Sequence, residues 1–271
     1  MAAGFLSFLK GKRNRDRKRE CGIEKEIRPT RGKDKSKITS PAFIMRILTY
    51  VPIIHTSADL GSLAKDVAKR GIADLGEDLW KEHTKTVDGF WDVVSHYFDS
   101  IDVKGAKIYQ DGMVAEGEVG EKIVEEGVKS NSRNYELVSR LLKRGAFLVK
   151  TEDFNLVKEE RDRLLTIIQA KSTTQKLVAF IKYKFVKNRL LRKRDKFIAW
   201  RINETLDDGE RGILFVGAFH NVKKWLAIDI QIKEAKDMRK IREYYRLLPF
   251  YDRHRERFEE LSRYLTSKAE S

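Results

Sequence analysis

The stretch Gly212-Ile213-Leu214-Phe215-Val216-Gly217-Ala218-Phe219-His220 is the strongest strand signal in the chain. Its apolar run is continuous and does not alternate with polar residues, which indicates a strand buried on both faces. A strand of that kind needs helices on either side, as in a parallel α/β sheet. The turn Asp207-Asp208-Gly209 separates it from a long helical stretch that precedes it.

The same alternation of apolar runs and helical periodicity extends along the chain. It predicts further strands over residues 46–55, 105–111, 146–153 and 225–232. Helices are predicted over residues 75–98, 119–128 and 134–143, then between 154 and 206, with a basic helix pair at the end. We therefore expect the α/β class, with a mainly parallel sheet of four to six strands, helices on both faces and a long-helix insertion.

Length and composition limit the possible classes of protein. With 271 residues, 41% of them apolar, the chain can bury a substantial core, and its 36% charged residues indicate a well-solvated surface. Cys21 is the single cysteine, which excludes an internal disulfide framework and a zinc finger. There is no apolar run of the roughly 18 residues that a membrane span needs, and no secretory signal is recognised. A reducing, cytoplasmic setting is therefore expected.

The net charge of +15 comes from two segments. Residues 1–40 carry 13 basic and 5 acidic side chains, and residues 171–196 carry 10 and 1. We expect residues 1–41 to be a basic, disordered arm, because they contain few large apolar residues. Residues 42–271 are expected to form one α/β domain, with the helical insertion around 154–206.

The second basic segment, residues 171–196, has apolar residues at helical spacing, so it predicts an amphipathic helix. One interpretation is a solvated basic face on a helix packed against the body. The other is a surface for nucleic acid or an anionic membrane, in which case binding to a phosphate backbone should weaken steeply with salt. The candidate contacts are Lys182, Lys184, Lys187, Arg189, Arg192 and Lys193.

Four predicted strands end in residues with catalytic or metal-binding chemistry. Parallel strands deliver their last residues to one edge of the sheet, where α/β proteins bind their ligands. Two imidazoles and several carboxylates could bind a divalent metal such as Mn, Zn or Co, or they could perform metal-free acid and base chemistry. The candidate metal ligands are His55, His220, Asp111, Glu152 and Asp153.

Several common catalytic motifs are absent from the sequence. There is no His-Glu-x-x-His helix, no phosphate loop ending in Gly-Lys-Ser/Thr, no Gly-x-Gly-x-x-Gly after a strand and no Gly-x-Ser-x-Gly elbow. These absences argue against the metalloproteases, nucleotide-binding folds and serine hydrolases that those motifs define.

Two segments resemble the late signature of the TraB/TIKI-like superfamily, which is related to ChaN-like and erythromycin-esterase-like proteins. They are Arg194-Asp-Lys-Phe-Ile-Ala-Trp-Arg-Ile-Asn-Glu204 and the strand that ends in Gly217-Ala-Phe-His220. The resemblance runs from about residue 46 to residue 236. Val51-Pro-Ile-Ile-His55 stands where the family has its first Gly-x-x-His, with Pro52 in place of the glycine.

The resemblance implies a metal-dependent hydrolase that acts on a peptide or on another small amide or ester. It implies that His55 and His220 form a histidine pair and that Arg194 is a buried cation facing the site. The partner carboxylate would come from Asp59, Asp111 or Glu152. Two alternatives remain open, namely a non-enzymatic protein that binds nucleic acid or anionic membrane, and a metal-dependent nuclease. The expected catalytic residues are His55, His220, Arg194 and Glu152.

Overall fold

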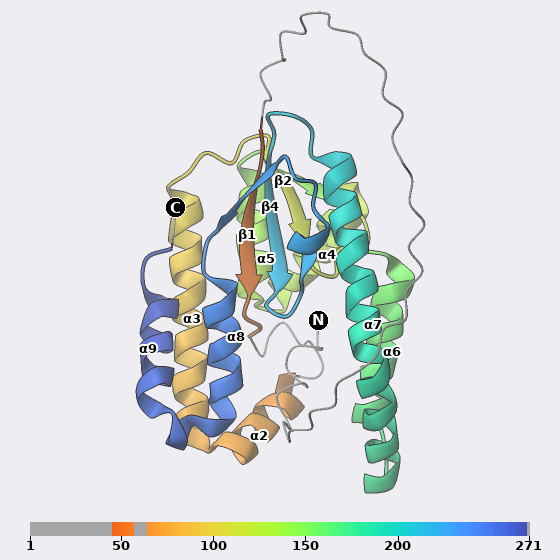
Figure 1. Ribbon diagram of the computed structural model, residues 1–271, viewed down its shortest axis with the longest axis vertical. Helices are drawn as coiled ribbons and strands as arrows, with labels where there is room; N and C mark the ends of the chain where they lie inside the picture. The colour runs from red at the N-terminus through yellow and green to blue at the C-terminus, as the bar shows by residue number, and fades with distance from the viewer. Residues whose placement is uncertain (1–44, 57–63, 270–271) are drawn as a thin grey trace, which may run out of the picture.

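The computed structural model describes residues 45–56 and 64–269. The predicted basic arm over residues 1–41 and the candidate Asp59 lie outside the described residues. The described part is an α/β structure with a parallel sheet at its centre (Figure 1).

Five parallel strands form the sheet, which confirms the predicted fold class. In the order β3-β2-β4-β1-β5, β4 lies in the middle and pairs with both β1 and β2. The apolar run that predicted β4 is buried from Gly212 to Val216, as expected for a strand covered on both faces. The strands are β1 (Arg46–Ile53), β2 (Lys107–Gln110), β3 (Phe147–Val149), β4 (Arg211–Gly217) and β5 (Ile230–Glu234).

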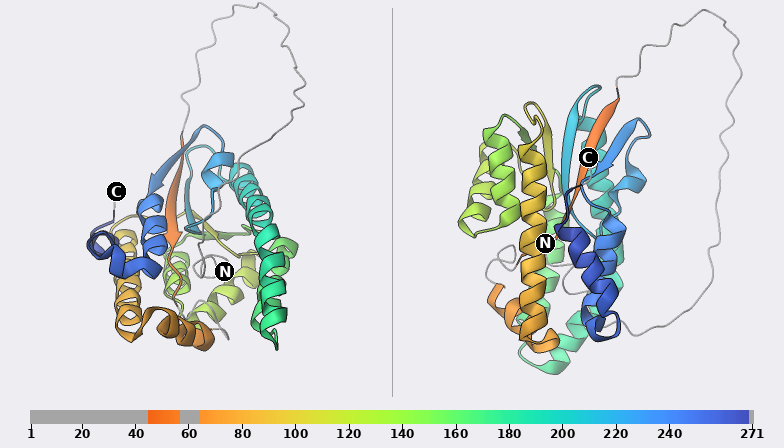
Figure 2. Two further views of the ribbon diagram at one scale, coloured as in Figure 1. Left: turned by 60° about the horizontal axis from the view of Figure 1, so that its bottom comes forward. Right: turned by 90° about the vertical axis from the view of Figure 1, so that its left-hand side faces the viewer.

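The connections place helices on both faces of the sheet. From β1 to β2 and on to β3 the chain moves in one direction through α2 (Ala64–Leu75), α3 (Glu77–Asp99), α4 (Gly117–Lys129) and α5 (Arg133–Lys143). It then returns to β4 through α6 (Phe154–Ile168) and α7 (Thr173–Thr205). Because such crossovers are right-handed, the outgoing and returning helices cover opposite faces. The last helices, α8 (Met238–Leu247) and α9 (Arg255–Thr266), join α3 on the first face (Figures 1 and 2).

The first face holds much of the hydrophobic core. On α3, Phe90, Trp91 and Phe98 are fully buried, and Phe98 lies 5.9 Å, ring to ring, from Phe215 of β4. The Trp91 indole N–H donates to the carbonyl of Ile54, just beyond β1, at 2.9 Å. This packing fixes the end of β1 against the helical layer, at the edge where the strands deliver their last residues.

The long helices after β3 form the expected insertion. Helices α6 and α7 pack against each other as a hairpin, and its lower part extends away from the sheet (Figure 1). That part has a small core of its own, made by Leu164, Ile167 and Tyr183 with Ala179 against them. Within the described ranges, none of the helices, even the 33-residue α7, is long and apolar enough to cross a membrane.

The fifth strand lies later in the chain than predicted. Residues 222–225 form a short 3₁₀ helix, η3 (Val222–Trp225), and the strand runs over Ile230–Glu234. Asn203 of α7 explains the shift, because its side chain donates to the Trp225 carbonyl and accepts from the Ala227 N–H, at 3.1 and 2.9 Å. Of the apolar residues that predicted the strand, Trp225 and Ala227 are therefore held beside α7, while Ile230 and Ile232 lie in β5.

Candidate functional site

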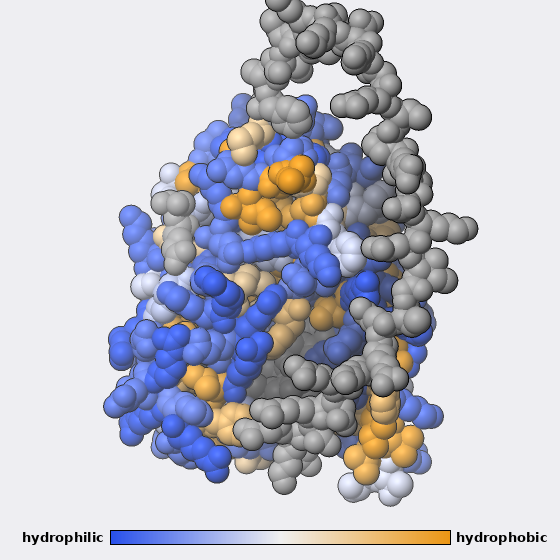
Figure 3. All heavy atoms as spheres, in the orientation of Figure 1, coloured by the Kyte–Doolittle hydropathy of each residue, from blue (hydrophilic) through white to orange (hydrophobic). Residues whose placement is uncertain are grey.

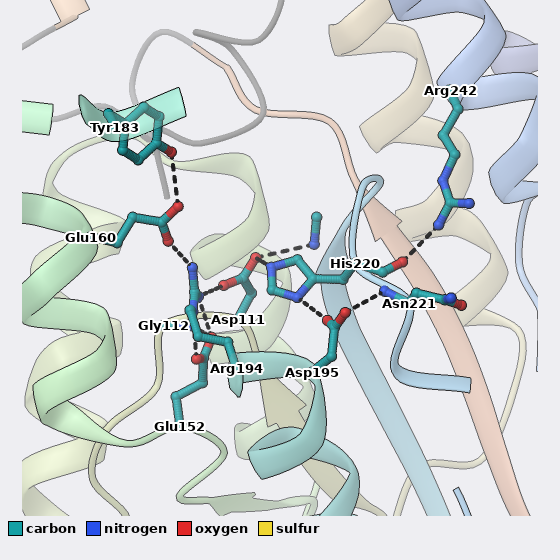
Figure 4. Close-up of polar contacts among 11 residues, drawn as sticks. Asp111, Gly112, Glu152, Glu160, Tyr183, Arg194, Asp195, His220, Asn221 and Arg242 are labelled. Carbon is teal, nitrogen blue, oxygen red and sulfur yellow. Dashed lines mark hydrogen bonds and ion pairs between the residues drawn. The ribbon is translucent and has the colours of Figure 1, made fainter. Parts of the chain in front are cut away.

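A buried polar cluster lies at the carboxyl edge of the sheet, where β2, β3 and β4 end (Figure 4). Asp111 follows β2, Glu152 follows β3 and His220 follows β4, while Arg194 and Asp195 come from the middle of α7. All five residues are buried, and none is more than 5% exposed. Topology brings the strand ends together, and α7 crosses over them on the return face.

His220 lies between two carboxylates. Its Nδ1 is 2.7 Å from Oδ1 of Asp195, and its Nε2 is 3.4 Å from Oδ2 of Asp111. The backbone holds this arrangement, because the Asn221 N–H donates to the other Asp195 oxygen at 3.0 Å. Burial lowers the pKa of His220, but the charge of Asp111 and the hydrogen bond with Asp195 outweigh it, so the pKa is raised. The charged imidazolium is therefore favoured in this site.

Arg194 binds three buried carboxylates at once. Its Nε donates to Oε2 of Glu152 at 2.7 Å, and its Nη2 donates to Oδ1 of Asp111 at 2.5 Å and to the second oxygen of Glu152. Its Nη1 donates to Glu160 of α6. Burial opposes its charge, but Glu152 and Asp111 more than compensate and hold the pKa of Arg194 well above its usual value. A buried arginine needs such partners, because an unpaired charge would be costly inside the protein.

The environment moves the pKa values of the two strand-end carboxyl groups in opposite directions. Burial raises the pKa of Glu152, although Arg194 opposes the shift. For Asp111, burial is outweighed by the charges of Arg194 and His220, which hold its pKa well below the usual range. Acid and base catalysis uses neighbouring groups of which one holds a proton while the other is ionised. Shifts of two pKa values in opposite directions produce such a pair.

Gly217 allows Asp111 to lie close to the end of β4. The Gly217 N–H donates to Oδ2 of Asp111 at 3.1 Å, and a Cβ on Gly217 would lie only 3.2 Å from the same oxygen. The strand therefore ends in a residue without a side chain, and this leaves room for the carboxylate that faces His220.

The expected divalent metal does not fit the cluster as it is arranged. Both oxygens of Glu152 and Oδ1 of Asp111 are directed at the Arg194 guanidinium, and Oδ2 of Asp111 accepts from the Gly217 N–H. Among the described residues, no group of three or more His, Cys, Asp or Glu side chains is placed to hold a metal ion. A metal at this site stays a prediction.

The remaining predicted site residues lie at the same edge with different roles. His55 is half-buried two residues beyond β1, and its pairing with His220 stays a prediction. Asp153 caps α6, because its Oδ1 accepts from the N–H groups of Asn155 and Leu156 at 2.9 and 3.0 Å. This placement gives Asp153 a structural role and does not support the predicted role as a metal ligand.

Three residues of the cluster were not among the predicted site residues, namely Asp195, Glu160 and Tyr183. Asp195 had a signal in the sequence, because it is the one acid among the ten basic residues of segment 171–196. Glu160 had none, since a glutamate on a helix is usually solvated. The Tyr183 hydroxyl donates to Glu160 at 3.1 Å and completes the chain of polar contacts.

The six predicted contact residues of the basic helix do not share one environment. Lys187 is partly buried and burial lowers its pKa, whereas the other five are exposed. The Arg192 guanidinium lies over the Trp225 ring, 5.7 Å from its centroid. Arg194, at the end of this segment, points into the buried cluster, the position that the family resemblance implies for it.

A cavity of about 620 Å³ adjoins the cluster, and His220 forms part of its wall. The other walls come from the ends of β1 and β5, the loop after β4 and the start of α8. The Arg242 guanidinium of α8 holds the loop by donating to the carbonyls of Ala218 and His220, at 2.5 and 2.6 Å. A buried titratable cluster therefore has an adjoining space in which a small molecule can bind.

Comparisons with known proteins do not assign this chain to a family. No family model matches the chain, and neither the curated proteins nor the solved structures gave a match. Fold and site together define a parallel α/β protein with a buried histidine, arginine and carboxylate cluster at the carboxyl edge of its sheet. The likeness to the TraB/TIKI-like superfamily stays a prediction that depends on the segments 194–204 and 217–220.

Proposed function

We propose that this chain is a hydrolase of ester or amide bonds, with its active centre at His220. One observation carries the proposal, namely that His220 is held between Asp195 and Asp111 and also lines a cavity. Histidine changes its charge near neutral pH, so a histidine oriented by a carboxylate is the usual proton-transfer group of such enzymes.

The proposed role of His220 follows from its two nitrogens. Nδ1 is committed to Asp195 by a hydrogen bond of 2.7 Å, which fixes the ring. Nε2 lies 3.4 Å from Asp111, longer than an ordinary hydrogen bond. Nε2 is therefore the atom that can exchange its partner for a water molecule or a leaving group, release its proton and take one up again.

In this proposal Arg194 is a positioning residue. It keeps Asp111 ionised beside the imidazole and holds Glu152 and Glu160 in place. Asp111 in turn stabilises the imidazolium that forms when His220 accepts a proton.

The charge of the cavity indicates the kind of substrate. Its two acids, Glu234 and Asp237, are each paired with a cation of the same wall, Lys223 and Arg239. Two further cations line the cavity, namely Lys233 and the fixed Arg242. We therefore propose a substrate with an anionic group, such as a carboxylate, beside the bond that is cleaved.

Metal dependence is a separate part of the proposal, because it comes from the family resemblance and not from the arrangement of the cluster. The same holds for the nuclease alternative, in which the metal and the basic helix would act together on a phosphodiester.

A substrate panel tests the proposal. The full chain is assayed with neutral and succinylated esters, peptide anilides and oligonucleotides, first with a chelator and then with Mn, Zn or Co. We expect turnover of an anionic ester or amide in the presence of chelator, and a loss of about 100-fold or more in His220→Ala, the range for a lost general acid or base. Asp195→Asn should lower kcat and shift its pH profile.

His254→Ala is the matched control, because His254 is exposed and lies at the start of α9, away from the cluster. It should keep full activity. Turnover that is equal in the native chain and in folded His220→Ala would refute the proposed active centre. Activity only with added metal would restore the metal-dependent version. Activity on oligonucleotides alone would favour the nuclease.

A further inference from the structure

The α6–α7 hairpin carries an exposed apolar stripe near its tip. Its four residues, all on the first half of α7, are Leu177, Val178, Ile181 and Phe185, with Phe185 83% exposed. The tip extends beyond the sheet, and apolar side chains gather there on the surface (Figures 1 and 3). Scattered exposed apolar residues are ordinary on protein surfaces, but a row of them on one helix is a binding feature.

Helix geometry places the stripe on the side of α7 away from the face that packs on α6, with Ile181 directly opposite that face. At about 100° per residue, Leu177, Ile181 and Phe185 drift only about 40° from one to the next and so share one face. Tyr183 and Leu190, which are buried, lie about 200° and 180° round the helix from Ile181. The stripe is therefore not the exposed edge of the hairpin core, because it lies on the other side of the helix.

Cations flank the stripe on both sides. Lys184 lies about 60° to one side of Ile181, and Lys182 and Arg189 lie about 100° and 80° to the other. All three are exposed. There is no acidic residue between Lys171 and Arg194 in the sequence. The outer face of the hairpin thus combines an apolar centre with basic borders.

We infer that this face docks on an anionic lipid membrane, lying in the plane of the headgroups. An apolar centre enters the acyl boundary while the flanking lysines reach back to the phosphates and carboxylates, which is the pattern of an interfacial helix. A nucleic acid would use the cations but would leave three aliphatic side chains against a hydrated sugar-phosphate backbone. If a second copy of this chain docked there through the same face, the cations of one copy would lie against those of the other and repel them.

The test is vesicle flotation of the full chain. The probe is phosphatidylcholine vesicles with roughly one-third phosphatidylserine, compared with pure phosphatidylcholine. We expect binding to the anionic vesicles, weaker binding to the neutral ones and a decrease with salt. Lys182→Gln, Lys184→Gln and Arg189→Gln together should reduce the partition coefficient by about fivefold for each charge removed. Ile181→Gln with Phe185→Gln should reduce it at least as strongly at unchanged charge.

Matched controls remove the same features elsewhere on the surface. Lys81→Gln, Lys85→Gln and Arg246→Gln take three exposed cations from α3 and α8, and Val119→Gln with Ile228→Gln takes two exposed apolar residues. Both controls should bind vesicles like the native chain, and circular dichroism should show all variants folded.

Four outcomes would overturn the inference. The first is the absence of vesicle binding by the native chain. The second is binding that persists in both hairpin variants, which would place the membrane affinity elsewhere in the chain. The third is binding of oligonucleotides, and not vesicles, that is lost with the three cations and kept when Ile181 and Phe185 are replaced. The fourth is a dimer, seen by size exclusion, that disappears in Ile181→Gln with Phe185→Gln.

Discussion

Arg194 is the residue at which the ionic contacts of the buried cluster meet. It is 1% exposed and neutralises carboxylates from two strand ends and from α6. When one partner of a buried ionic group is removed, the remaining charges stay buried without compensation. This costs more free energy than the intact group contributes to stability. The stability of the cluster therefore depends on this one side chain.

We predict that Arg194→Met lowers the free energy of unfolding by about 3–5 kcal/mol, because three carboxylates would lose their buried cation. Urea denaturation followed by circular dichroism measures the loss. Adding Glu152→Gln should recover part of it, since one of the uncompensated charges is then gone. Arg189→Met, on the exposed face of the same helix, should change stability by less than about 0.5 kcal/mol. An Arg194→Met protein as stable as the native chain would contradict the ionised cluster.

The α6–α7 hairpin is the element that joins the cluster to the proposed membrane face. Near the sheet, α7 packs on η3 and supplies Arg194 and Asp195 to the cluster. Farther out, its support is the small core around Leu164, Ile167 and Tyr183. A segment with so little buried apolar surface opens at lower free energy than the main core.

We predict that Leu164→Ala loosens the outer half of the hairpin without unfolding the sheet. The substitution removes buried methyl groups at a cost of about 2 kcal/mol, the low end for a leucine whose site can collapse. Hydrogen exchange should accelerate in peptides from residues 160–185 and stay unchanged in β4. Leu141→Ala, in the main core, is the control and should accelerate exchange throughout the molecule. Faster exchange in β4 of Leu164→Ala would show that the hairpin is not a separate unit.

Two buried histidines shape the pH dependence of the whole molecule. Burial lowers the pKa of His83 to about 4, and its Nδ1 lies 2.8 Å from the Tyr244 hydroxyl. His83 is therefore neutral in the fold, and its contribution is lost as the pH falls from 6.5 towards 4. His220 has a raised pKa, so its contribution is complete below 6.5 and is lost as the pH rises through the raised value.

We predict that thermal stability passes through a maximum near pH 6.5, and that each limb depends on a different histidine. His83→Leu should flatten the acid limb, which is worth about 3 kcal/mol between pH 6.5 and 4 at 1.36 kcal/mol per pH unit. His220→Asn should flatten the alkaline limb. Calorimetric Tm values from acid to mildly alkaline pH measure both, with His254→Ala as the control. If His220→Asn keeps the native alkaline limb, the imidazolium is not what stabilises the fold there.

The amino-acid sequence by itself determined the fold class and the edge at which the cluster lies. Apolar runs without alternation require a sheet covered on both faces, and parallel strands must release their last residues at one edge. The sequence therefore predicts that Asp111, Glu152 and His220 lie together at that edge. The inward position of Arg194 also agrees with the expectation from the family resemblance.

Only the tertiary structure decided which side chains complete the cluster and what each one contacts. The packing of α6 on α7 brings Glu160 and Tyr183 to Arg194, and helical periodicity does not encode the partner of a helix face. The hydrogen bonds of Asn203 keep the segment from Trp225 to Ala227 out of the sheet, although its apolar residues are typical of a strand, and β5 begins only at Ile230. Local propensity is a weak preference, and such long-range contacts override it because they bury more surface and satisfy more polar groups than the local alternative.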